Sequence, residues 1–136
     1  MISLDSRIMY VSSTAQLGVV GSGTKLRFIQ RGSRFIAKYS GGNIQRGCLV
    51  GKIINETLEW HYLQYEQSGE LHSGRSTCEI IEGIDGKVRV IEHFQWQTRP
   101  GSGTNVFDEL PPEPDINNLV SKLSLETQSK RSLASQ

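Results

Sequence analysis

The sequence predicts an all-β fold: an eight-stranded, antiparallel, up-and-down barrel. Apolar and polar residues alternate over most of the chain, and this is the period of strands that have one buried face. Turn-forming residues separate these stretches at short intervals. Loops this short join antiparallel neighbours, because a parallel crossover needs about a dozen residues. A sheet of sequential strands removes its exposed edges by closing, so we expect a barrel.

Each predicted strand is bounded by turn formers such as Gly41-Gly42 and Asn55-Glu56, since glycine and asparagine tolerate the positive φ of tight hairpins. The predicted strands are Arg7–Thr14, Thr24–Gln30, Arg34–Ser40, Ile44–Ile54, Thr57–Gln67, Glu70–Glu82, Lys87–Thr98 and Thr104–Leu110. Gly47, Gly51 and Gly74 lie inside these strands, where glycine predicts a bulge or a sharp bend that helps the sheet to close.

Composition excludes several classes of protein. The chain has 136 residues with 15 Lys and Arg against 14 Asp and Glu, so we expect neither a nucleic acid nor a membrane as partner. No apolar run approaches the ~20 residues that cross a bilayer, and Met1–Tyr10 does not resemble a signal peptide. Cys48 and Cys78 fit neither a disulfide framework nor a metal motif, although they could pair if adjacent in space. The expected location is the cytoplasm.

The domain organisation changes after the last predicted strand. Residues 1–110 form the predicted barrel domain, and residues 111–136 begin with a proline-rich linker. Asp115–Leu125 places its apolar residues at the spacing of one helical face, with Asp115 as N-cap. This segment is predicted either as a short amphipathic helix or as part of a disordered tail. Thr127–Gln136 is predicted to be disordered.

Alternation assigns most aromatic side chains to the barrel interior together with several polar ones. Glu92 is among them, and burying a carboxylate without a partner costs several kcal/mol, so it should be paired, protonated or hydrated. Aromatic walls with a few converging polar groups favour a small-molecule pocket, and the alternative is a structural hydrogen-bond network. The candidate ligand-binding residues are Gln30, Tyr39, Trp60, Tyr62, Gln64, Arg75, Glu92 and Trp96.

Within this set, tryptophan and tyrosine would supply stacking walls, and Gln30, Gln64 and Glu92 would orient the ligand. Arg75 would pair with Glu92 if a bulge turned it inward. The outward-facing apolar residues predict a dimer interface, or a docking site for the C-terminal helix, if they lie side by side. They are Ile29, Ile36, Leu63, Tyr65 and Ile91.

The other motifs in the sequence do not predict a phosphate-binding, metal or catalytic site. The glycine-rich segment Gly18–Lys25 lacks the Gly-Lys-Ser/Thr ending of a phosphate loop and precedes no helix pattern. His61 and His93 face outward by alternation and show no ligand spacing, so we expect no metal and no cofactor. No nucleophile elbow occurs. Asp108-Glu109 ends the last strand, where a structural pairing with arginines such as Arg46 or Arg75 is favoured over acid–base catalysis.

The order of the short motifs resembles a family of bacterial proteins. These motifs are Phe28-x-Gln30-x-Gly32, Tyr39-x-Gly41-Gly42-x-Ile44-x-x-Gly47-x-Leu49-x-Gly51, Leu58-x-Trp60-x-Tyr62, Gly74-Arg75-Ser76, Gly86-Lys87-Val88-Arg89-Val90-x-Glu92-x-Phe94-x-Trp96-x-Thr98 and Asp108-Glu109. The family has a calycin-like barrel of the lipocalin and avidin type, and many members bear the name N-acetylglutamate synthase. The resemblance implies a ligand inside the barrel.

Three functions remain open from the sequence. The leading one is a small-molecule-binding barrel. The second is an enzyme that uses Glu92 as acid or base, N-acetylglutamate synthase included. An acetyltransferase of that kind needs a mixed α/β fold with a coenzyme A cradle at a helix N-terminus, so a non-enzymatic role is favoured. The third is a barrel with a solid core that binds a partner through its outer face.

Overall fold

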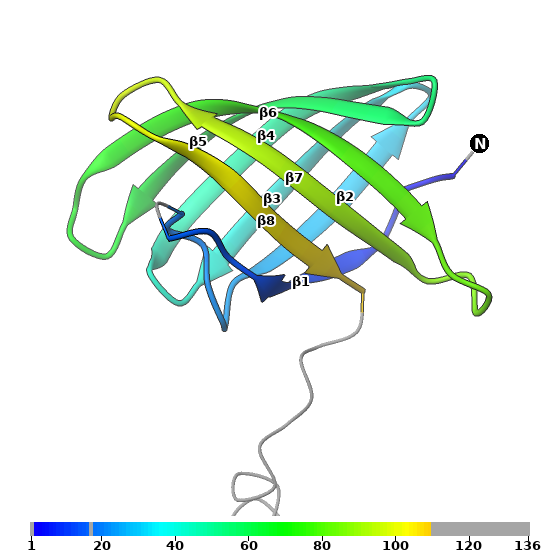
Figure 1. Ribbon diagram of the computed structural model, residues 1–136, viewed down its shortest axis with the longest axis horizontal. Helices are drawn as coiled ribbons and strands as arrows, with labels where there is room; N and C mark the ends of the chain where they lie inside the picture. The colour runs from blue at the N-terminus through cyan, green and yellow to red at the C-terminus, as the bar shows by residue number, and fades with distance from the viewer. Residues whose placement is uncertain (1, 17, 110–136) are drawn as a thin grey trace, which may run out of the picture.

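The computed structural model describes residues 2–16 and 18–109 as one closed, antiparallel barrel in which each strand pairs with the next. Figure 1 shows the strands wrapping around a common axis. The strands are β1 (Ile8–Ser13), β2 (Lys25–Arg31), β3 (Arg34–Gly41), β4 (Ile44–Ile54), β5 (Thr57–Glu66), β6 (Leu71–Glu82), β7 (Val88–Trp96) and β8 (Ser102–Asp108). The predicted eight-stranded up-and-down barrel is therefore confirmed.

Pairing between the first and last strands closes the sheet. Tyr10 of β1 lies opposite Asp108 of β8, and the register shifts once, between Val11 and Ser13. At the β4–β5 turn, Asn55 and Glu56 both have positive φ, 49° and 66°, as a two-residue hairpin turn of this hand requires. The turns after β2, β4 and β6 lie at one end of the barrel. The connection between β1 and β2 and the turns after β3, β5 and β7 lie at the other.

Glycines inside the strands lie under aromatic rings rather than at bends. A Cβ on Gly51 would lie 2.5 Å from the ring of Phe35, and one on Gly74 would lie 2.1 Å from Tyr62 Oη. Both glycines lie in unbroken ladders directly opposite these aromatic residues. The predicted bulge is therefore wrong for both positions, whereas Gly47 does lie beside a register shift between Ile44 and Arg46.

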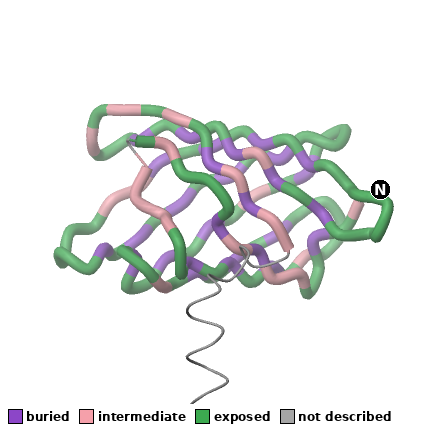
Figure 2. The backbone as a smooth tube through the Cα atoms, turned by 60° about the horizontal axis from the view of Figure 1, so that its bottom comes forward, coloured by how far each residue is buried: buried purple, intermediate pink, exposed green. Residues whose placement is uncertain are grey.

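Burial alternates along each strand, as Figure 2 shows for most of the barrel wall, so the predicted division into two faces is confirmed. One half of the interior is filled with rings: Trp60 lies 6.3 Å from Phe28, 6.1 Å from Phe35 and 6.4 Å from Phe107, between ring centroids. Rings at these distances and tilts add packing energy beyond the area that they bury. This half of the barrel has an aromatic core.

The cysteines and the C-terminal segment were the other subjects of the sequence predictions. Cys48 is exposed and Cys78 is buried, and both are free thiols. No helix among the described residues is both long and apolar enough to cross a membrane. The predicted helix Asp115–Leu125 and the predicted tail lie outside the described residues.

Candidate functional site

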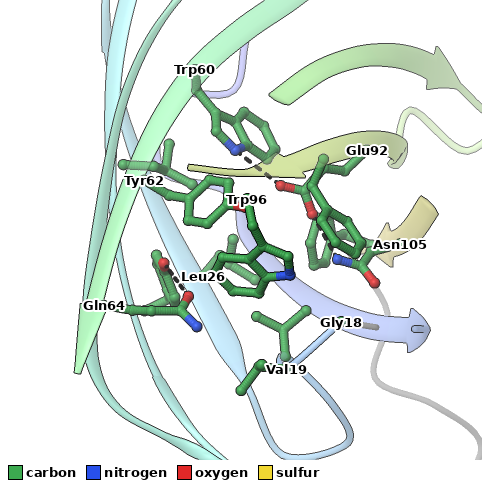
Figure 3. Close-up of a pocket in the computed structure, with 14 residues that line it drawn as sticks. Gly18, Val19, Leu26, Trp60, Tyr62, Gln64, Glu92, Trp96 and Asn105 are labelled. Carbon is green, nitrogen blue, oxygen red and sulfur yellow. Dashed lines mark hydrogen bonds between the residues drawn. The ribbon is translucent and has the colours of Figure 1, made fainter. Parts of the chain in front are cut away.

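The other half of the barrel holds a small, partly open cavity of about 30 Å³. It lies between the aromatic core and the β1–β2 connection, whose residues Gly18, Val19 and Val20 form part of its lining (Figure 3). The strands supply the rest of the lining, from Leu26, Tyr39, Leu49, Trp60, Tyr62, Gln64, Glu92, Phe94, Trp96, Asn105 and Phe107. The cavity therefore has aromatic walls and a small group of polar side chains.

Glu92 is the centre of the first polar cluster. Its Oε2 accepts hydrogen bonds from Trp60 Nε1 at 3.0 Å and from Ser76 Oγ at 2.6 Å. Its Oε1 accepts one from Asn105 Nδ2 at 2.8 Å. Asn105 Oδ1 in turn accepts from Thr14 Oγ1 and from the backbone N–H of Ala15, both at 3.0 Å. Both carboxyl oxygens accept hydrogen bonds, and the group has no ion-pair partner among the described residues.

Burial raises the pKa of Glu92 above its ordinary value of 4.5, against the opposing effect of the hydrogen bonds from Ser76, Asn105 and Trp60. The folded chain therefore binds this proton more tightly than the unfolded chain does. The stabilisation from Glu92 is complete below pH 4.5 and is lost as the pH rises through the folded pKa.

We therefore expect the unfolding free energy of the wild type to fall, relative to that of Glu92→Gln, as the pH increases from below 4.5. Urea unfolding of both proteins at a series of pH values measures this difference, and the variant cancels the contributions of all other groups. A difference that is constant with pH, or that grows with pH, would contradict the expectation.

A second polar cluster runs from the cavity to the end of the barrel. Tyr39 Oη donates to Gln64 Oε1 at 2.8 Å, and Gln64 Nε2 donates to Glu66 Oε2 at 3.0 Å. Glu66 Oε1 accepts from Arg99 Nη2 at 2.6 Å. The Arg99 guanidinium lies 4.5 Å from the ring centroid of Trp96, a cation–π contact. This chain of contacts fixes the side chains around the cavity mouth.

Tyr62 differs from Tyr39 in one respect. Its Oη is buried, yet it makes no hydrogen bond with any residue that the structure describes. Its ring meets Trp96 edge-on at 5.3 Å between centroids, and burial raises the pKa of both phenols, so both stay protonated. The Oη lies over Gly74 of the neighbouring strand, where a Cβ would come within 2.1 Å of it, and an unpaired buried hydroxyl costs about 1–3 kcal/mol.

Six of the eight predicted ligand-binding residues line this cavity: Tyr39, Trp60, Tyr62, Gln64, Glu92 and Trp96. Gln30 does not, because it lies at the opposite end of the barrel, where it accepts from the backbone N–H of Leu4 and donates to the carbonyl of Gly32. Arg75 does not either. The ladders on both sides of it are regular, so no bulge turns it inward, and its exposed side chain contacts Gln95.

Sequence reasoning missed Asn105, Glu66 and the β1–β2 connection as parts of the site. Asn105 lies directly opposite Glu92 on β8 and could have been found by extending the alternation through that strand. No repeating pattern marks Val19 and Val20. The predicted partners of Asp108 and Glu109 were also wrong. The structure pairs Asp108 with Arg89 and Glu109 with Arg7, because these are the arginines that neighbouring strands bring to the rim.

One group of side chains has the composition of a metal site. Ligand atoms of Glu66, Glu70 and His72 lie within 4.8 Å of one another at the β5–β6 turn. Glu66, however, already binds Arg99 and Gln64. A cation there would have to displace the arginine, so the arrangement does not favour a metal. His72 itself is partly buried and lies 6.1 Å from Trp96, between ring centroids.

These features define a small closed β-barrel with an aromatic and polar cavity at one end. Residues 2–110 match a family described as avidin-like protein, and the chain belongs to that family. This agrees with the predicted calycin-like resemblance, whereas nothing in the match supports the name N-acetylglutamate synthase. No curated protein and no solved structure matches the chain.

Proposed function

We propose that this protein binds a small, partly polar molecule in the cavity between Trp60, Trp96 and the β1–β2 connection. The observation that carries the proposal is a cavity whose aromatic walls include Tyr62, a residue whose buried hydroxyl has no hydrogen-bond partner among the described residues. Small-molecule sites are mostly apolar cavities with a few placed polar groups. Membership of the avidin-like family supports the same general function.

The size of the cavity limits which ligand can enter it unless the protein changes its conformation. A water molecule needs at least ~10–15 Å³ of such space, so a cavity of about 30 Å³ accepts a group of about two non-hydrogen atoms. A larger ligand requires Val19 and Val20 to move outward. Both residues lie on a connection rather than in a strand ladder, so this motion breaks no sheet hydrogen bonds.

The polarity of the lining selects the kind of group. Among the described residues that line the cavity, Glu92 is the one ionisable carboxyl, and none is Lys or Arg. An anionic group would therefore be buried beside a carboxyl without a compensating cation, which is unfavourable. Gln64 Nε2 retains a second amide hydrogen beyond its bond to Glu66. The lining thus favours a neutral hydrogen-bonding group or a cationic one.

The proposal predicts that a ligand is retained through gentle purification. Native mass spectrometry of freshly purified protein should show a mass above that of the chain. Denaturing mass spectrometry of the same sample should return the mass of the chain alone and release the ligand for identification. Bare protein from every preparation, with no binding by any member of a library of small neutral and cationic molecules, would contradict the proposal.

The two cavity tyrosines offer a matched pair of variants for the same test. Tyr39→Phe loses its bond to Gln64 and should lower the unfolding free energy by about 1 kcal/mol. Tyr62→Phe loses no bond to the described residues, so its stability should equal or slightly exceed that of the wild type. Its affinity for the identified ligand should nevertheless fall about tenfold. Urea unfolding and calorimetric titration measure the two effects, and unchanged affinity in Tyr62→Phe would exclude this hydroxyl as a ligand contact.

A further inference from the structure

The outer surface of the barrel separates its charges in a way that the nearly neutral total conceals. No Asp or Glu occurs between Asp5 and Glu56. As a result, β2, β3 and β4 contain no acidic residue but seven of the fifteen Lys and Arg of the chain. All seven are exposed, and none takes part in an ion pair with a described residue. We call them the basic face: Lys25, Arg27, Arg31, Arg34, Lys38, Arg46 and Lys52.

The strand register places these cations side by side. Arg27 lies directly opposite Lys38, and Arg34 lies between Arg31 and Lys52 on the neighbouring strands. Like charges opposite one another destabilise a sheet, and an anionic partner would offset that cost. One acidic residue lies at the margin, because Glu59 of β5 lies opposite Lys52.

Between the two rows of cations lies a row of aliphatic side chains. Ile29, Ile36 and Val50 are cross-strand neighbours, and they are 53%, 42% and 60% exposed. Each row lies two residues along the strand from the next, or roughly 7 Å. Of the predicted apolar patch, Ile29 and Ile36 lie side by side in this row. Leu63 and Tyr65 lie on β5 opposite Cys48 and Arg46, and Ile91 lies apart on β7. The surface alternates from basic to apolar to basic.

Although the balanced total charge predicts no membrane partner, we propose that the basic face binds the surface of an anionic lipid membrane. Lys and Arg side chains would meet the phosphate-bearing headgroups while the aliphatic row enters the boundary with the acyl chains. A second copy of the chain fits less well, because a two-fold contact through this face would bring cations against cations. A nucleic acid would use the cations but has no need of three exposed aliphatic residues. This proposal is independent of the ligand in the barrel.

The test is co-sedimentation of the full chain with vesicles of phosphatidylcholine and phosphatidylserine, against vesicles of phosphatidylcholine alone. We expect binding to the anionic vesicles that weakens as salt is added. The double variant Arg27→Gln/Lys38→Gln should bind about 25-fold more weakly, since each Lys or Arg near an anionic leaflet contributes about fivefold. The control Arg75→Gln/Lys87→Gln removes the same charge from exposed positions outside the basic face and should bind as the wild type does.

A third variant distinguishes lipid binding from the binding of other partners. Ile36→Ser/Val50→Ser should weaken vesicle binding about tenfold, because it removes the apolar part of the contact. Three results would overturn the proposal: no binding to anionic vesicles, equal loss in the charge variant and in its control, or tight binding of a labelled oligonucleotide that Ile36→Ser/Val50→Ser leaves unchanged. A dimer in analytical ultracentrifugation that this apolar variant dissociates would assign the face to self-association instead.

Discussion

Replacing Gly51 with alanine is expected to destabilise the barrel by about 3 kcal/mol, at the upper end of the usual cost of overpacking. The new Cβ would lie 2.4 Å from the backbone carbonyl oxygen of Glu59 and 2.5 Å from the ring of Phe35. Phe35 is buried against Trp60, so its ring cannot swing away without opening the core. The carbonyl belongs to the neighbouring strand, so relief on that side requires β4 and β5 to separate. Urea unfolding, followed by tryptophan fluorescence, measures the loss.

Alanine substitutions at two other glycines test whether the contacts of the added Cβ determine the loss of stability. The three atoms nearest a Cβ on Gly47 all belong to the ring of Tyr39, the closest at 2.3 Å, and none is a backbone atom, so Gly47→Ala should cost less than Gly51→Ala. Its cost should include part of the Tyr39–Gln64 hydrogen bond, because the ring must turn. Gly21→Ala meets nothing within 4 Å and should change the unfolding free energy by no more than about 0.5 kcal/mol. Equal losses at all three positions would show that general backbone entropy, rather than these contacts, sets the cost.

The sequence pattern predicted which side chains face the barrel interior, but not where along the barrel axis they lie. Alternation is a local property, so it placed Trp60, Tyr62, Glu92 and Trp96 inside the barrel without knowledge of the register. It failed for Gln30, which has the inward parity but lies at the end of β2. There the N-terminal segment, through Leu4, decides its hydrogen bonds. Parity gives the side of the sheet, but the position along the barrel axis depends on tertiary contacts.

Features that depend on pairing between distant strands were harder to predict. The bond between Glu92 and Asn105 follows from the β7–β8 register, which the length of the intervening turn determines. The covering of the cavity by Val19 depends on how an irregular connection folds back, and no periodic signal encodes that. The sequence between Asp5 and Glu56 contains no acidic residue, which indicates the basic face. The nearly balanced charge of the whole chain does not reveal this local excess.

Replacing Glu92 with leucine should have the second large effect, a loss of about 4 kcal/mol of unfolding free energy. Leucine fills much of the same volume, so little of this loss comes from a cavity. The main cause is that Trp60 Nε1 and Asn105 Nδ2, which can only donate, would remain buried without an acceptor, and each such group costs about 1–3 kcal/mol. Ser76 Oγ can rotate to another acceptor and should contribute less. Urea unfolding at neutral pH measures the total.

A double-mutant cycle tests this reason directly. Trp60→Phe removes the Nε1 donor. In a protein that carries Trp60→Phe, Glu92→Leu therefore no longer leaves a buried indole N–H without an acceptor. Glu92→Leu should therefore cost about 1–2 kcal/mol less in the Trp60→Phe background than in the wild type. Strict additivity would mean that the carboxyl does not stabilise the indole, and the first polar cluster would then not act as a structural unit. Coupling of the expected size would instead make Glu92 a fixed part of the cavity wall, which is what a preorganised hydrogen-bonding contact for a ligand requires.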